Sequence, residues 1–247
     1  MTPMFTELAR MGSARNSRGG QRPRYFLLHT QEGNGTAESL AAYLNNTANS
    51  VSYHYTLDNS VTVVDVVDTD YASWSVGGAN AYSINLCFAG SRAVWTRAQW
   101  LNNMGRAIDV AAYLCAQDCK KYGIPARWLG SGGNYRAANA GVSDHQYVTS
   151  VIGWGTHTDV GRGFPADVFA TALTKYMTDD DQEDDMASNI DKDIREQITG
   201  STNLGSYPGW PQLGDRTLVD AVAAIGEKLG VADCYDTRAD RNGSAAG

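Results

Sequence analysis

The sequence predicts an α/β protein in which a central mixed β-sheet is flanked by helices. Short runs of apolar, β-branched and aromatic residues alternate along the first 178 residues with longer segments whose apolar residues recur at helical spacing. The chain has 247 residues, of which 43% are hydrophobic. This length and composition allow one medium-sized globular domain and a smaller second module.

Five segments make up the N-terminal half of this domain. Residues 1–22 are rich in Arg, Gly and Ser and predict a mobile arm, with a short helix near "FTELAR". The apolar run "YFLLHT" (25–30) predicts a buried strand, and "GTAESLAAYLNN" (35–46) predicts a helix. The segment "VSYHYTLDNSVTVVDVV" (51–67) predicts a hairpin, and "YSINLCFAG" (82–90) predicts a central strand.

A long helix and a loop complete the domain. Thr96 followed by Gln99 forms a capping box, so the helix is expected to begin there and to end near Gly123. Residues 127–145 are rich in Gly, Ser and Asn and predict a loop. Pro165 suits the first turn of a last helix.

The charge is distributed unevenly along the chain. Residues 1–178 have a net charge of +2 and residues 179–247 a net charge of −9. The run "DDDQEDD" (179–185) has six carboxylates, which repel one another, so it predicts an acidic linker before a module over residues 186–247. The acidic balance argues against a nucleic-acid partner. No apolar run is long enough for membrane insertion.

The cysteines are expected to be free thiols. The N-terminal sequence lacks the apolar core of a secretory signal peptide, which predicts synthesis and folding in a reducing cytosol. Cys115 and Cys119 are spaced i,i+4 on the predicted long helix. Because no second pair lies nearby, we interpret them as buried thiols rather than metal ligands.

The histidines are the candidate metal ligands, and the chain has four. A catalytic zinc site needs three protein ligands and an open position for water. His29 ends a predicted buried strand and is well placed for such a site. In "SYHYTLD", strand alternation would put Tyr53 and Tyr55 on one face and His54 on the other, so we interpret His54 as a structural residue. Composition and spacing alone are compatible with a zinc hydrolase but do not distinguish it from other classes.

Four motifs, in this order, carry a resemblance to a known family: "YFLLHT", "SYHYTLD", "ASWSVGGANAYSINLCFAG" and "HTDVGRGFP". The sequence resembles the type-2 N-acetylmuramoyl-L-alanine amidases, which include phage endolysins and the peptidoglycan recognition proteins. The likeness is strongest to amidase modules of phage lysins that attack actinobacterial hosts. It covers residues 23–178, which we therefore expect to be a zinc amidase domain.

The resemblance implies a set of metal ligands. The family binds one catalytic Zn²⁺ through a histidine that ends the first strand, a second histidine and a later Cys or Asp. These positions match His29, His145 and Asp159. The interval from His145 to Asp159 is 14 residues, longer than in relatives.

The resemblance also implies catalytic and substrate-binding residues. His157 stands two positions before the last ligand, where relatives with a catalytic role have a cationic or hydrogen-bonding residue. Tyr53 matches the catalytic tyrosine of one branch, whereas Cys87 stands where another branch has glutamate. Trp74 matches a substrate-contacting position, although ordinary core packing is an equal alternative. Asp144 is an alternative base, which we interpret as a loop residue.

The resemblance implies a phage endolysin that hydrolyses the amide between N-acetylmuramic acid and L-alanine in bacterial peptidoglycan, for host lysis. Such a protein would stay in the host cytoplasm until a holin releases it to the cell wall, which agrees with the absence of a signal peptide. Three alternatives remain: a peptidoglycan-binding protein without activity, a zinc peptidase that cuts within the peptide stem, and a virion protein for wall penetration.

The module over residues 186–247 is expected to serve wall attachment or self-association. It contains no histidine. Two apolar stripes at helical spacing predict two short amphipathic helices. The stripes are Ile190, Ile194 and Ile198, and Leu218, Val222, Ile225 and Leu229. The negative charge of the module would oppose binding to anionic wall polymers, which favours self-association.

Overall fold

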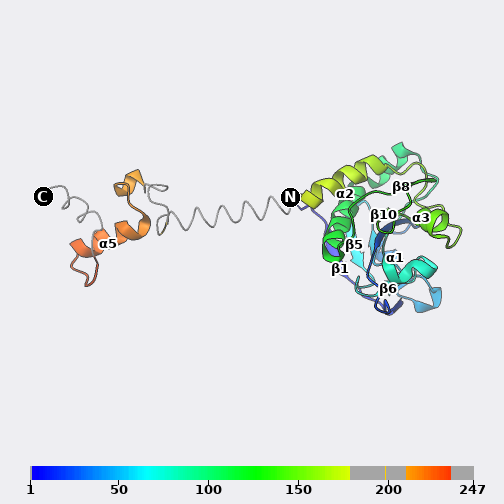
Figure 1. The fold of residues 1–247 in the computed structure, drawn as a ribbon, viewed down its shortest axis with the longest axis horizontal. Helices are drawn as coiled ribbons and strands as arrows, with labels where there is room; N and C mark the ends of the chain where they lie inside the picture. Colours follow the sequence, from blue (N-terminus) through cyan, green and yellow to red (C-terminus); the bar gives the residue numbers. More distant parts are fainter. Residues whose placement is uncertain (1, 179–197, 199–209, 235–247) are drawn as a thin grey trace. The chain divides into compact units, whose positions relative to one another are not determined.

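The computed structural model describes residues 2–178, 198 and 210–234, and the chain divides into two compact units (Figure 1). The first unit is Met1–Asp179 and the second is Asp180–Gly247.

The first unit is built on a six-stranded mixed sheet, which confirms the predicted fold class. The strand order is β1 (Thr6–Ala9), β5 (Thr62–Asp65), β4 (Tyr55–Leu57), β7 (Ser83–Phe88), β3 (Tyr25–Thr30) and β10 (Gly141–Asp144). Only the β4–β5 hairpin is antiparallel, and the other neighbouring pairs are parallel. The carboxyl ends of β3, β7 and β10 therefore lie at one edge of the sheet.

Helices cover both faces of this sheet. One hydrophobic cluster packs α2 (Arg97–Tyr122) and the helix over residues 166–178 against the sheet, and another packs α1 (Ala37–Leu44) against the opposite face (Figure 1). All six residues of β3 are buried. Phe26 and Leu28 join the α2 cluster, so His29 faces the α1 side by strand alternation.

The predicted boundaries of the long helix are confirmed. The Thr96 hydroxyl accepts a hydrogen bond from the Gln99 backbone N–H, and the Gln99 side chain accepts one from the Thr96 N–H. Gly123 ends the helix in the left-handed region, with a φ of 69°. Cys115 and Cys119 are buried free thiols of the core, as predicted.

The remaining short elements are connectors. They are the 3₁₀ turns η1 (Thr47–Asn49), η2 (Gly77–Tyr82) and η4 (Pro211–Leu213), the short helix α3 (His145–Tyr147), the π-turn η3 (Val148–Ile152), and the two-residue strands β2 (Arg15–Asn16), β6 (Ala72–Ser73), β8 (Gly130–Ser131) and β9 (Asn134–Tyr135).

The prediction of a mobile arm over residues 1–22 is wrong. The "FTELAR" segment forms β1, which pairs with β5, and β2 pairs with β6. Arg18 is buried, and its guanidinium donates hydrogen bonds to the backbone carbonyls of Thr69, Ala81 and Ser83. The arm is held by backbone and guanidinium hydrogen bonds, which leave no apolar pattern in the sequence.

Two further predictions need correction. The predicted loop over 127–145 contains β8, β9 and β10, and β10 is an edge strand of the main sheet. Tyr53 and Tyr55 do not share a face, because Tyr53 packs with the α1 cluster and Tyr55 with the α2 cluster. The regular strand β4 begins only at Tyr55, so Tyr53 lies outside it and the alternation does not extend to it.

In the second unit, the structure describes η4 and α5 (Leu218–Lys228), whose N-terminus is capped by the Thr217 hydroxyl. Ile190 and Ile194 of the predicted first stripe lie outside the described residues. No helix within the described parts of the chain is both long enough and apolar enough to cross a membrane.

Candidate metal centre

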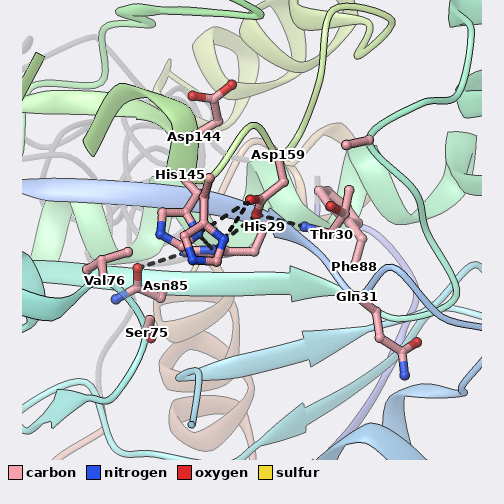
Figure 2. A network of polar contacts seen from close by, with 12 residues as sticks. His29, Thr30, Gln31, Ser75, Val76, Asn85, Phe88, Asp144, His145 and Asp159 are labelled. Carbon is pink, nitrogen blue, oxygen red and sulfur yellow. Dashed lines mark hydrogen bonds and ion pairs between the residues drawn. The ribbon is translucent and has the colours of Figure 1, made fainter. Parts of the chain in front are cut away.

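Two histidines meet because their strands are parallel neighbours. His29 is the fifth residue of β3, and His145 directly follows β10. The register pairs Asp144 with Leu28, which places the two histidines side by side at the carboxyl edge of the sheet. Their Nδ1 atoms lie 3.1 Å apart (Figure 2).

Asp159 comes from the loop before the last helix of the unit and reaches the same point. Its backbone carbonyl accepts a hydrogen bond from the Gln146 N–H at 2.9 Å, which fixes the loop beside His145. Its Oδ2 lies 3.4 Å from His29 Nδ1, and its Oδ1 lies 3.4 Å from His145 Nδ1. The Thr30 N–H donates to the same carboxylate at 3.3 Å.

The spacing of these donor atoms fits a bound metal ion. Zn–N and Zn–O bonds of about 2.0–2.2 Å at tetrahedral angles place neighbouring ligand atoms roughly 3.3–3.5 Å apart. The two Nδ1 atoms are 3.1 Å apart, and each lies 3.4 Å from one of the two Asp159 carboxylate oxygens, which is close to this value. Two imidazoles and one carboxylate, all buried, are also a donor set that catalytic zinc uses. The residues present therefore fit the metal that the resemblance implies.

The electrostatics of the centre also suit a cation. Burial alone would raise the pKa of Asp159, but its interactions with the His145 and His29 imidazoles outweigh burial and hold the pKa well below its usual range. Burial lowers the pKa of His145, which favours the neutral imidazole. A charged carboxylate beside neutral imidazole nitrogens is the state in which these groups bind a metal.

A residue that was not predicted contacts His29 through the ring nitrogen that faces away from His145 and Asp159. Asn85 lies on β7, and its Oδ1 is 2.9 Å from His29 Nε2 (Figure 2). Its side-chain amide also donates to the hydroxyls of Ser73 and Ser83. A polar residue in the middle of an apolar strand, two residues before Cys87, was the available signal. Asn85 gives His29 an outer-shell partner of the kind that orients metal ligands.

The two residues predicted to be catalytic both lie against the ligands. The His157 ring stacks on the His145 ring, with a centroid separation of 3.9 Å and an interplanar angle of 12°. The His157 Nδ1 is 3.7 Å from Asp159 Oδ1. The His157 side chain is 60% exposed, so it stands at the open side of the centre. The Tyr53 ring lies 4.7 Å from the His29 ring. Burial raises the pKa of Tyr53, which keeps its phenol protonated at neutral pH.

Three other residues considered from the sequence, His54, Asp144 and Trp74, make hydrogen bonds within the fold. His54 is buried, and its Nδ1 accepts a hydrogen bond from the Asn85 backbone N–H. Burial lowers its pKa to about 3. Asp144 caps α3 by accepting from the Tyr147 N–H, and its carboxylate points away from the histidines (Figure 2). Trp74 is half-buried, and its backbone N–H donates to the Ser52 hydroxyl.

A cavity of about 680 Å³ adjoins the segments that carry the ligands. Gln146 and Thr158, each next to a ligand in the sequence, line it together with residues 93–96. A Cβ atom at Gly161 would lie 2.0 Å from the Ala93 carbonyl oxygen, so this close backbone approach requires glycine. The cavity is large enough for a short peptide or a sugar.

His29, His145 and Asp159 thus form a buried group that could hold a metal ion. Residues 19–162 match the sequence family described as N-acetylmuramoyl-L-alanine amidase. This match covers more than half of the chain, and the chain belongs to that family. It is an enzyme that hydrolyses the amide between N-acetylmuramic acid and L-alanine in peptidoglycan.

Other matches concern the second unit and the fold. Residues 177–233 match a family described as the Rv3766 C-terminal domain. No curated protein was found to match the chain. The structure of the Staphylococcus aureus hydrolase AmiA in complex with its ligand is similar, with a TM-score of 0.58 and 19% identity over 72% of this chain and 86% of that chain.

Two further solved structures are similar at lower scores. The N-acetylmuramoyl-L-alanine amidase LysC from Clostridium intestinale has a TM-score of 0.49 and 14% identity, over 70% of this chain and 99% of that chain. A mutant endolysin from Bacillus subtilis has a TM-score of 0.45 and 19% identity, over 69% of this chain and 99% of that chain.

Proposed function

We propose that this amidase depends on one Zn²⁺ held by His29, His145 and Asp159. The observation that carries the proposal is the convergence of three buried donor groups at the spacing of a tetrahedral metal site. When bound, zinc would supply a water of lowered pKa and polarise the carbonyl of the scissile amide.

The roles of the neighbouring residues follow from their positions. His157 stands at the exposed side of the centre, where its imidazole can donate a hydrogen bond to the oxyanion or move a proton to the leaving amine. The Tyr53 hydroxyl is a neutral donor on the opposite side, next to His29. Trp74 would contact the glycan or the peptide stem.

The products of wall digestion test this function. Purified actinobacterial wall treated with the protein should gain free L-alanine amino termini without new reducing sugars. Treatment with a chelator should abolish the release, and added Zn²⁺ should restore it. New amino termini within the stem would indicate a peptidase, and binding without new ends would indicate a recognition protein.

We further propose that the protein is a phage endolysin that acts on an actinobacterial host. It would remain in the host cytoplasm until a holin releases it to the cell wall, as the resemblance to phage lysins implies. Expressed alone in a bacterial host it should leave the culture intact, and co-expression of a holin should cause lysis. Lysis without a holin would contradict this role. Detection of the protein in purified virions would instead support a part in wall penetration.

For the second unit we propose self-association. The face of α5 formed by Leu218, Val222, Ile225 and Leu229 is exposed in the described part of this unit, with exposed fractions of 49 to 76%. Full-length protein should sediment as an oligomer, and Val222→Asp should shift it to the monomer. A wild-type chain that stays monomeric at high concentration would contradict self-association and leave wall attachment as the role of the module.

A further inference from the structure

Asn85 belongs to a buried hydrogen-bond network on the α1 side of the sheet, behind the metal centre. Its side chain is fully buried between His29 and three serines that come from β6, β7 and the segment after β6. Figure 2 shows Asn85 next to the His29 ring, with Ser75 beyond it. The hydroxyl groups in this network each have one proton, so the direction of every hydrogen bond can be derived.

The first branch runs through Ser73 and Ser75. The Ser75 hydroxyl donates its proton to the Ser52 backbone carbonyl at 2.6 Å, and a carbonyl can only accept. Ser75 must therefore accept the 2.6 Å hydrogen bond that joins it to Ser73. This uses the proton of Ser73, so the atom of Asn85 that lies 3.1 Å from Ser73 Oγ has to be a donor.

The second branch leads to the same result independently. The Ser83 hydroxyl donates to the Ala79 backbone carbonyl at 2.9 Å. It can then only accept from Asn85, at 3.0 Å. Both serines require the amide NH₂ of Asn85 on their side, so the amide oxygen Oδ1 faces His29.

The direction of the amide determines the tautomer of His29. Because Oδ1 is an acceptor, the His29 Nε2 at 2.9 Å must carry the proton. The neutral imidazole then has its lone pair on Nδ1. This is the atom that lies 3.1 Å from His145 Nδ1 and 3.4 Å from the Asp159 carboxylate.

We infer that Asn85, with its amide oriented by Ser73 and Ser83, is a positioning residue that holds His29 in the Nε2–H tautomer and so presents Nδ1 to the metal. The inference rests on the proposed role of His29 as a ligand. Asn85 contacts neither the proposed metal position nor the cavity in which substrate would lie. It therefore acts through His29, on metal affinity rather than on the chemical step.

The wild-type protein without metal tests the tautomer directly. Long-range ¹H–¹⁵N NMR at pH 8 should show His29, identified as the signal that disappears in His29→Gln, as a neutral imidazole with the proton on Nε2. A His29 signal with the proton on Nδ1, or with both tautomers populated, would overturn the inference. The measurement needs neither zinc nor substrate, so its outcome is separate from that of the proposed function.

Two variants at one position test the effect on metal binding. Asn85→Leu keeps the size of the side chain but removes the acceptor, and Zn²⁺ affinity in a chelator competition should fall by about 10–100-fold. Asn85→Asp keeps an acceptor oxygen for Nε2–H but loses the N–H donors to Ser73 and Ser83, so its Zn²⁺ affinity should lie between those of wild type and the leucine variant. Equal affinity of the leucine variant and wild type would overturn the inference. If the leucine variant does not fold, as judged by thermal unfolding, the wild-type tautomer decides the question.

Discussion

Two buried aspartates in the same unit are in opposite electrostatic situations. Asp159 at the candidate metal centre is 8% exposed, and Asp118 on α2 is 3% exposed. The pKa of Asp159 lies well below the usual range, because its interactions with the His145 and His29 imidazoles outweigh its burial. Burial raises the pKa of Asp118 to about 7, and the one hydrogen bond from the Tyr55 hydroxyl lowers it only in part.

The difference shows what burial requires of a carboxylate. Removing a charge from water is costly, so a buried acid either becomes neutral or is surrounded by groups that favour its charge. Asp159 has two imidazole nitrogens and the Thr30 N–H around it. Asp118 accepts a hydrogen bond from the Tyr55 hydroxyl. Only the first arrangement keeps a charged oxygen ready for a cation, and the following predictions test this contrast.

The largest effect is expected from removal of a ligand. Asp159→Ala and His29→Ala should each lose zinc, measured by metal analysis, and at least ~10³-fold in amide hydrolysis, because a tetrahedral site with an open position cannot spare a protein ligand. The matched control is Asp118→Asn, which also alters a buried aspartate and should keep zinc and activity. Stoichiometric zinc in Asp159→Ala would contradict the ligand assignment.

His157→Ala should have the next largest effect. It should keep near-stoichiometric zinc and lose about 10²–10³-fold in kcat, because it removes a donor at the exposed side of the centre without removing a ligand. Loss of zinc from this variant, together with retention of zinc in His145→Ala, would mean that His157 rather than His145 is the metal ligand.

A smaller loss of about 10–10²-fold is expected for Tyr53→Phe. Only the hydroxyl is removed, and the ring can still pack against His29. Zinc content and the unfolding temperature should match those of wild type. Unchanged hydrolysis would show that the phenol is structural.

The sequence predicted the parts of the molecule that follow a regular pattern. The buried strand that ends in His29 and the capping box at Thr96 are local signals, and both are present in the structure. The resemblance indicated His29, His145 and Asp159, and the structure brings these three together. Strand pairing explains why, since β3 and β10 are parallel neighbours.

The features that were missed depend on contacts between distant segments. β1 is recognisable only through its pairing with β5, and Asn85 only through the serines around it. The alternation argument for Tyr53 and Tyr55 failed because the regular strand begins only at Tyr55, so Tyr53 lies outside it. Periodicity cannot show the start of a regular strand or a buried polar network.

The smallest effect concerns stability rather than activity and tests the other half of the contrast. The pKa of Asp118 is raised from 3.8 to about 7 in the folded protein, so between these values the folded state binds more protons than the unfolded state. The contribution of Asp118 to the free energy of unfolding should therefore fall as the pH rises from about 4 to about 7 and then level off. This difference in the pKa of Asp118 between the folded and unfolded states corresponds to a loss of at most about 4 kcal/mol in the free energy of unfolding.

Asp118→Asn removes this dependence while it keeps an acceptor for the Tyr55 hydroxyl. Urea unfolding should show the variant to be more stable than wild type at pH 8, and the two should converge near pH 4. Asp109→Asn is the matched control, because Asp109 lies half-buried on the same helix and accepts a hydrogen bond from the Tyr176 hydroxyl. The gain at pH 8 should be larger for Asp118→Asn than for Asp109→Asn, because only Asp118 is fully buried. If the two variants gain equally in stability at pH 8, or neither gains, water or Lys121 compensates the charge of Asp118. Asp118 would then be charged like Asp159, and the proposed electrostatic difference between them would be wrong.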